Sequence, residues 1–170
     1  MLDNYMQLTE QQRRELVPAQ PSIWHFYEKL SRRLILWNII NFGTGVILQA
    51  FTSFWRGVGS QAIGWSVVNF AIGFFGQRGN ERRAAKPDSH MPERMAREAR
   101  NIRAILWLNA GLDILYMLGG WSWARRAAQT GGANAEYQRG MGIGIVIQGG
   151  LLFIWDVINA LLVPRYEKRD

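Results

Sequence analysis

Four long apolar stretches constrain this chain more than any other feature of its sequence. They run over residues 34–54, 58–75, 104–121 and 141–163, and Asp113 and Asp156 are the two charged side chains within them. A helix needs about 20 mostly apolar residues to cross a bilayer. Hydrocarbon forces such a segment to be helical, because its backbone groups can bond only to one another. The sequence therefore predicts an all-α, polytopic membrane protein whose domain 34–163 is a bundle of four transmembrane helices.

The Lys and Arg side chains lie mostly on one side of these predicted spans. Residues 1–33, the loop 76–103 and the tail 164–170 hold five, eight and three of the 20, whereas the two hairpin connections hold only four. Basic residues favour the cytoplasmic side of a membrane. We therefore expect a multi-pass protein of the inner cell membrane with both termini in the cytoplasm. In a soluble protein the net charge of +7 would suggest nucleic acid, but this distribution predicts no nucleic-acid partner.

Residues 1–33 are predicted to form a helical amino-terminal arm. Pro18 and Pro21 break the chain, and Ser22 is a residue type that caps the start of a helix. The segment after Ser22 mixes Trp, Phe and Tyr with Glu, Lys and Arg, which suits an amphipathic helix lying in the membrane interface. A plain helical extension of the first span is an equally good interpretation.

The cytoplasmic loop 76–103 divides at Pro87. Residues 79–89 are polar and are predicted to be flexible, whereas residues 91–103 are helix formers that continue into the third span. This second part carries a basic stripe, which consists of Arg94, Arg97, Arg100 and Arg103. The stripe is either the positive anchor that insertion requires or a surface that binds anionic lipid or a partner protein.

The four spans resemble two copies of one helical hairpin. Setting Asn41 on Asn109 aligns the first span with the third, and residues 56–59 resemble residues 139–142 at the start of the second and fourth. Two hairpins related in this way would form a parallel repeat about an axis along the membrane normal. Short apolar segments also match by chance, so duplication and coincidence remain equally good interpretations.

Polar side chains recur at helical spacing along each predicted span, which places those of one span on one face. We expect these faces to turn inward and to form a candidate polar intramembrane site. Its residues are Asn41 on the first span, Gln61 and Asn69 on the second, Asn109 and Asp113 on the third, and Gln148, Asp156 and Asn159 on the fourth.

Asp113 and Asp156 are the most informative members of this set. An Asp at the centre of a spanning helix costs about 2.5–3.5 kcal/mol, and no Lys or Arg lies within a predicted span to neutralise either one. They could form a site for a proton, a cation or a cationic solute. They could also be neutral hydrogen-bonding groups that hold helices together, at about 0.6 kcal/mol per contact, or contacts to the helices of a partner.

Several classes of site are excluded by composition. The chain has no Cys, so it can form no disulfide, thiolate nucleophile, iron–sulfur cluster or zinc–thiolate site. His25 and His90 lie outside the spans, which excludes a haem held between two intramembrane His ligands. We predict no catalytic residues, no metal site and no cofactor, and therefore no enzyme.

The sequence favours a small membrane protein with a proton- or cation-linked transport or solute-binding role. Its intramembrane Asp and Asn residues would form the site. The alternative is a non-catalytic structural or accessory subunit of a larger membrane complex. Because four helices enclose little interior, we also expect a homo-oligomer or a larger membrane complex, with the lipid bilayer as the surrounding medium.

Overall fold

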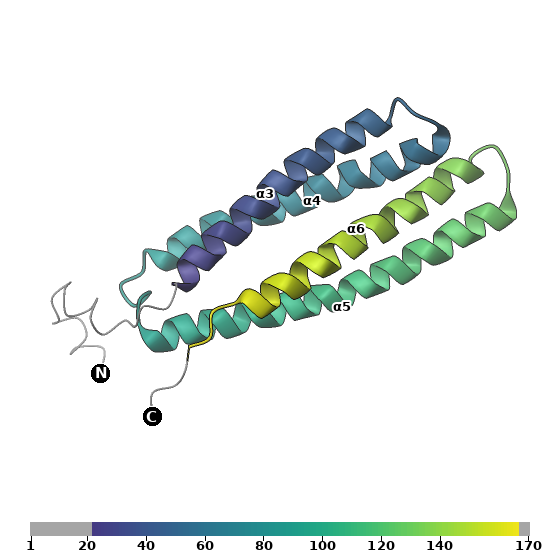
Figure 1. Cartoon of the computed structure of the whole chain (residues 1–170). Coiled ribbons are helices and arrows are strands. Elements are labelled where there is room, and N and C mark those ends of the chain that lie inside the picture. The colour runs from purple at the N-terminus through teal and green to yellow at the C-terminus, as the bar shows by residue number, and fades with distance from the viewer. Residues whose placement is uncertain (1–21, 167–170) are drawn as a thin grey trace.

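The computed structural model describes residues 22–166, and this part of the chain forms four helices and no strand. The helices are α3 (Ile23–Leu48), α4 (Ser53–Ala84), α5 (Pro92–Thr130) and α6 (Ala135–Leu162). Figure 1 shows two antiparallel hairpins side by side, a first hairpin of α3 and α4 and a second hairpin of α5 and α6. The predictions for residues 1–21 and 167–170 lie outside the described residues.

The helices α4, α5 and α6 are long and apolar enough to cross a membrane. Their outward faces are apolar: Phe75, Leu115 and Leu161 are 69%, 62% and 63% exposed. A large continuous apolar surface is typical of a chain that lies in lipid or against a partner rather than in water. The predicted all-α class is confirmed, together with three helices suited to crossing a membrane.

The helix α3 ends earlier than the predicted span 34–54. It ends at Leu48, and the backbone turns over residues 49–52, inside the apolar stretch 34–54. The uncharged part of α3, residues 34–48, is about 22 Å long, which is less than the hydrocarbon thickness of about 30 Å. The predicted boundary at residue 54 is therefore wrong. The sequence did not reveal this turn, because no Gly or Pro marks it.

At its other end α3 continues through the predicted arm. It begins at Ile23, where the backbone N–H of Trp24 donates to Oγ of Ser22 at 3.3 Å, and it has no break at residues 33–34. Ile23, Trp24 and Tyr27 are buried in a cluster with residues of α5 and the end of α6, including Met95, Ile102, Leu106 and Val163. Residues 23–33 are therefore a helical extension that packs on the bundle.

The connection between the hairpins is shorter than predicted. The helix α4 continues to Ala84 and α5 begins at Pro92, so only residues 85–91 lie outside helices. The prediction of a flexible segment is thus wrong for residues 79–84, whereas the helix predicted over residues 91–103 is confirmed. We call this end of the bundle the loop end, and the end with the turns at 49–52 and 131–134 the hairpin end.

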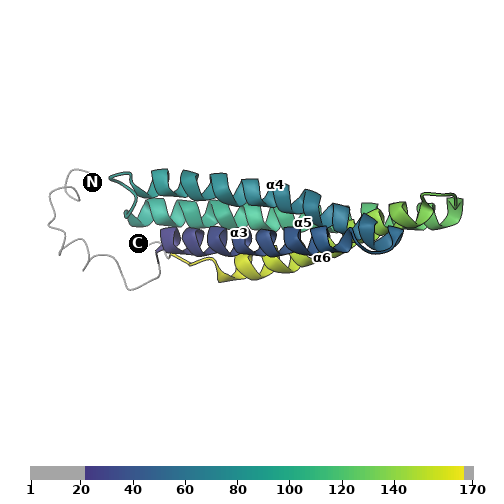
Figure 2. The same ribbon diagram turned by 90° about the horizontal axis from the view of Figure 1, so that it is seen from above.

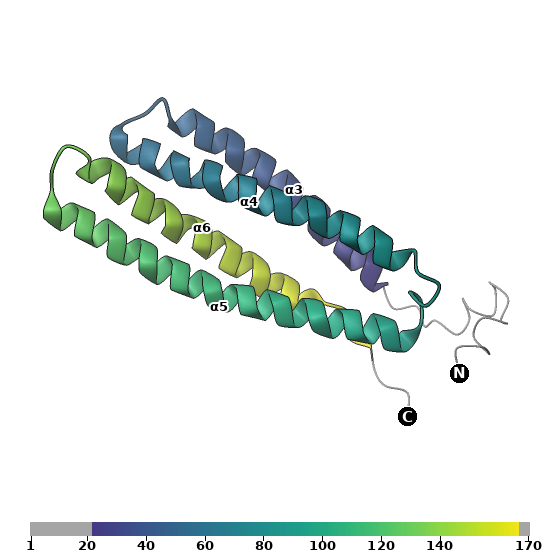
Figure 3. The ribbon, with the colours of Figure 1, turned by 180° about the vertical axis from the view of Figure 1, so that it is seen from behind.

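The two hairpins are staggered along the bundle. Figures 2 and 3 show the turn of the second hairpin projecting well past the turn of the first. This turn contains Gly131 and Gly132, which have φ of 66° and 93°. Glycine reaches these backbone angles without the steric cost that a side chain would add, which allows the tight reversal between two long helices.

Glycines bring the helices into backbone contact at the hairpin end. A Cβ at Gly140 of α6 would clash with the carbonyl of Phe54 in α4, and one at Gly57 of α4 would clash with the carbonyl of Tyr137 in α6. These two glycines thus join the hairpins. Within each hairpin a further pair does the same, Gly45 with Gly59 and Gly120 with Gly142.

The two within-hairpin pairs occupy equivalent places. A Cβ at Gly45 would lie 2.8 Å from the Gly59 carbonyl oxygen, and one at Gly120 would lie 2.7 Å from that of Gly142. This match agrees with the alignment of residues 56–59 on 139–142. It also sets Gly45 on Gly120, which places Asn41 on Tyr116 rather than on Asn109, so the alignment predicted for the first and third spans differs from the packing.

Candidate functional site

Asp113 of α5 and Asp156 of α6 lie together inside the second hairpin. They are 4% and 8% exposed, and their carboxyl groups are within hydrogen-bonding reach of each other. Helical side chains tilt toward the N-terminus of their own helix. Because α5 and α6 are antiparallel, the two carboxyl groups lean toward one another. Gly149 lets the helices approach here, since a Cβ on it would be 3.2 Å from the Asp113 carbonyl oxygen.

The surroundings of this pair contain no compensating positive charge. No Lys or Arg lies in residues 104–124 of α5 or 140–163 of α6. Oδ2 of Asp113 is buried and receives no hydrogen bond from any other residue of the described chain. Two adjacent carboxylates repel each other, and burial penalises the charge on each. Chemically, such a pair is suited to sharing a proton.

The acidic pair has no further acidic or His side chain grouped with it in the described part of the chain. Within residues 22–166 there is no group of three or more His, Asp or Glu side chains that could hold a metal ion. Two carboxyl groups alone provide few of the six to eight oxygen ligands that Ca²⁺ takes.

The predicted amides Asn41 and Gln148 form a bridge between the hairpins. Nδ2 of Asn41 donates to Oε1 of Gln148 at 2.9 Å, and Nε2 of Gln148 donates to Oδ1 of Asn41 at 3.1 Å. The equivalent positions on the other two helices are Tyr116 and Trp65, whose rings pack edge to face with centroids 5.1 Å apart. The hairpins thus meet through two matched contacts, one polar and one aromatic.

Two of the remaining predicted polar residues, Asn159 and Gln61, make their hydrogen bonds outside the acidic pair. Asn159 lies about one turn from Asp156 but donates to the Trp155 carbonyl of its own helix at 2.8 Å. Asn69 is buried in α4, and Gln61 packs on α6 with Nε2 3.5 Å from the sulfur of Met141. Asn109 is exposed on α5. The prediction that Asn109 shares the inward face of Asp113 is therefore wrong.

The predicted basic stripe is divided rather than continuous. Arg94 contacts Asp88 at 3.4 Å and Glu98 at 3.6 Å, and Arg103 donates to the carbonyl of Val163 at the end of α6 at 2.9 Å. Only Arg97 and Arg100 are exposed. Half of the stripe thus serves the packing of the bundle, because a three-residue repeat drifts around a helix with 3.6 residues per turn.

A buried acid at the loop end was not identified from the sequence. The Glu98 side chain is 7% exposed, and Oε2 lies 3.4 Å from Nη1 of Arg83. The Tyr27 hydroxyl donates to the same oxygen at 3.2 Å. Burial raises the pKa of Tyr27, so the hydroxyl keeps its proton and remains a donor. The available signal was the position of Glu98 between Met95 and Ile102, on the apolar face of a basic segment.

The chain matches a known protein family. The model of a family of unknown function, DUF6992, matches residues 33–157, which is more than half of the chain. This range contains both acids and every predicted polar residue except Asn159. No curated protein and no solved structure matches the chain.

Proposed function

The chain belongs to the DUF6992 family of unknown function, and we propose that it is a membrane transport or solute-binding protein whose Asp113–Asp156 pair carries a proton. The pair shares one proton at rest. Release and uptake of that proton change the charge inside the second hairpin, and this change is coupled to the binding or movement of a solute. Such an intramembrane acid is the usual element of a proton relay.

The observation that carries this proposal is a contrast between the two hairpins. When α3 is aligned with α5 by setting Gly45 on Gly120, Asn38 takes the place of Asp113. When α4 is aligned with α6 by setting Gly59 on Gly142, Gly73 takes the place of Asp156. Nδ2 of Asn38 donates to the Leu34 carbonyl of its own helix at 2.7 Å. The first hairpin therefore packs with the same glycine contacts and without a carboxyl group.

Packing alone thus does not require the acids. Each Asp costs about 2.5–3.5 kcal/mol when it is placed at the centre of a spanning helix, whereas an interhelical hydrogen bond returns about 0.6 kcal/mol. A residue type that is costly and is absent from the equivalent hairpin is better explained by binding than by structural support.

The proposed membrane arrangement includes α3 as a fourth span. Its uncharged length is short, but tilting, local thinning of the bilayer and the long side chains of Arg32 and Arg33 accommodate such a mismatch. The basic residues at the loop end favour the cytoplasmic side. Both termini and residues 85–91 then lie in the cytoplasm, and the hairpin end lies outside.

The test combines a spectroscopic readout with a flux measurement. In lipid vesicles, the infrared band of a protonated carboxyl group should appear in the native protein, change in frequency in Asp113→Asn and in Asp156→Asn, and disappear in the double variant. Both single variants should also abolish the dissipation of a pH gradient in the presence of a transported solute, with Glu136→Gln on the exposed tip as the control. A native protein without a protonated carboxyl band contradicts the proposal.

A second candidate function is a structural or accessory subunit, and Asn109 favours it. This amide is exposed on α5, a helix apolar enough to cross a membrane, and polar side chains at such positions hydrogen-bond to neighbouring helices. In that case the native protein shows no flux across a broad panel of solutes. The Asp113→Asn and Asp156→Asn variants then behave like the native protein in every transport assay.

A further inference from the structure

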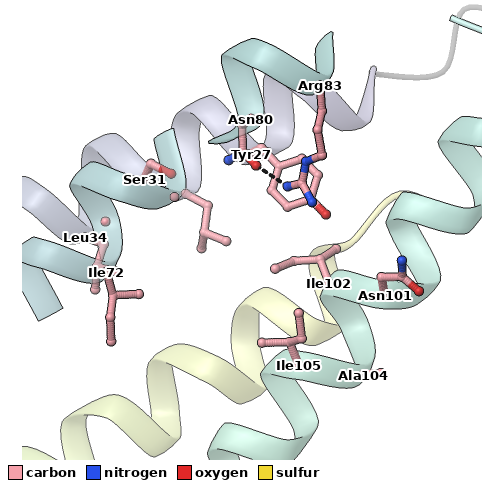
Figure 4. A pocket seen from close by; sticks show the side chains of 13 residues that line it. Tyr27, Ser31, Leu34, Ile72, Asn80, Arg83, Asn101, Ile102, Ala104 and Ile105 are labelled. Carbon is pink, nitrogen blue, oxygen red and sulfur yellow. Dashed lines mark hydrogen bonds between the residues drawn. The ribbon is translucent and has the colours of Figure 1, made fainter. Parts of the chain in front are cut away.

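A groove opens between the two hairpins at the loop end, away from the acidic pair. Its volume is about 570 Å³, and Figure 4 shows side chains of α3, α4 and α5 around it. That volume lies within the range of about 300–1,000 Å³ that is usual for small-molecule sites. We propose that this groove binds one anionic phospholipid, with its phosphate at Arg83 and one acyl chain along the apolar wall.

The lining of the groove changes from polar to apolar along the bundle. Tyr27, Asn80 and Arg83 lie at the end nearest the 85–91 connection, and Leu34, Ile72 and Ile105 lie toward the hairpin end. Between these two parts, the α4 side of the groove is lined by Gly73 and Gly76, which have no side chains to fill it. This gradient matches a molecule with a charged head and a hydrocarbon tail.

The depth of the groove points to a lipid rather than to a soluble ligand. Its apolar end lies within the predicted spans 58–75 and 104–121, whereas Asn80 and Arg83 lie beyond Phe75, the last residue of the first of these spans. The groove therefore crosses the boundary between hydrocarbon and headgroups, as a phospholipid does. A lateral opening at this depth is in direct contact with the bilayer.

The partly exposed guanidinium of Arg83 at the polar end can bind an anionic headgroup. The Arg83 side chain is 40% exposed. It is oriented by Glu98, by the Oδ1 atom of Asn80, which accepts from Nη2, and by the Tyr27 ring, whose centroid lies 5.3 Å from Cζ. Its Nε atom is buried and has no hydrogen-bond partner in the described chain.

The rim of the groove adds further positive charge. Arg94 and Asp88 form ion pairs beside Arg83 and Glu98, so the charges of these four side chains cancel. Arg97 and Arg100 are exposed one helical turn before the lining residues Asn101 and Ala104, so they lie on the same faces of α5. A base near an anionic headgroup contributes about 1 kcal/mol, which is about fivefold in binding.

The experiment measures lipid retained by the full-length protein in detergent. The protein is equilibrated with equal amounts of phosphatidylglycerol and phosphatidylcholine that have identical acyl chains, and the bound lipid is counted by native mass spectrometry. Arg83→Gln should lower the ratio of bound phosphatidylglycerol to phosphatidylcholine about fivefold. Arg82→Gln, the adjacent and exposed position, makes the same charge change outside the groove and should leave the ratio near its native value.

A second pair of variants tests the groove without changing charge. Gly76 lines the groove, and a Cβ on it would meet no atom within 4 Å, so Gly76→Leu fills the space without a clash. It should remove most of the bound lipid of both kinds. Gly79→Leu, which also enters open space but does not line the groove, is the matched control.

Three outcomes would overturn the proposal. Equal retention by Gly76→Leu and Gly79→Leu would show that the groove is not the lipid site. An unchanged lipid ratio in Arg83→Gln, with Gly76→Leu still defective, would show an acyl-chain site without headgroup selection. Displacement of the bound phosphatidylglycerol by inorganic phosphate would assign the polar end to a free anion. The proton proposal is independent of all three, because neither acid lines the groove.

Discussion

The two ends of the bundle are held together in different ways. At the hairpin end, Gly57 and Gly140 bring two backbones into contact, with Gly45–Gly59 and Gly120–Gly142 on either side. At the loop end the contacts come from large and charged side chains, including Trp24, Tyr27, Met95, Arg83 and Glu98. Glycine backbones pack directly on one another at the hairpin end, whereas large and charged side chains make the contacts at the loop end.

The side-chain core at the loop end agrees with the proposed membrane arrangement. In lipid there is no hydrophobic driving force between helices, so close backbone packing of small residues supplies the attraction. Where water is available, burial of apolar surface becomes favourable, and a cluster such as Ile23, Trp24 and Tyr27 can form. In the proposed membrane arrangement, the side-chain core at the loop end therefore lies where water is available.

The largest test of this comparison is a side chain at Gly140. Gly140→Val should lower the free energy of unfolding by at least about 3 kcal/mol, at the upper end of the cost of overpacking, because its Cβ would clash with the Phe54 carbonyl. Thermal unfolding in detergent, followed by circular dichroism, measures the effect. Gly64→Val places the same side chain in open space on α4 and should have little effect. Equal stability of the two variants would refute the backbone contact.

An intermediate effect is expected at the loop end from Glu98→Gln. This change removes the carboxylate that lies between Arg83 and Arg94 and accepts from Tyr27, and hydrogen bonds to charged groups are worth about 1.5–3 kcal/mol. Glu136→Gln breaks an exposed pair with Arg139 at the hairpin end, which is worth at most about 1 kcal/mol. Chemical denaturation of both variants compares them, and a larger loss in Glu136→Gln would contradict the buried role of Glu98.

The smallest effect is expected between the two ends, at the Asn41–Gln148 bridge. A double-mutant cycle with Asn41→Leu and Gln148→Leu should give a coupling energy of about 0.6 kcal/mol, the average for such bonds in membrane proteins. The same cycle on Tyr116→Leu and Trp65→Leu tests the matched aromatic contact. Additive effects in both cycles would mean that neither contact couples the hairpins.

Much of the fold could be predicted from apolar length alone. The helices α4, α5 and α6 follow from long uncharged segments, because a chain without water has no other way to satisfy its backbone. The turn at 49–52 could not be found in this way, since Gln49, Ala50, Phe51 and Thr52 continue the uncharged run. The end of α4 at Ala84 was missed for the opposite reason, because its polar last turns resemble a loop.

The candidate site was predictable in composition but not in geometry. Asp113 and Asp156 stand out as charges within apolar segments, yet their contact depends on the close approach of α5 and α6 at Gly149. Asn109 shares a helical spacing of four with Asp113 but lies exposed. The buried face of α5 is narrow, so a position one turn away can already be exposed. The sequence does not show which of two such positions faces the partner helix.

The stagger of the two hairpins has a mechanical consequence. The helix α5 has 39 residues, which is about 58 Å of rigid rod, nearly twice the hydrocarbon thickness of about 30 Å. It carries the Gly131–Gly132 turn at one end, Asp113 near its middle and Glu98 near the other end. A force applied to the protruding tip would therefore act along the whole of α5, about the Gly120–Gly142 contact that joins this helix to α6.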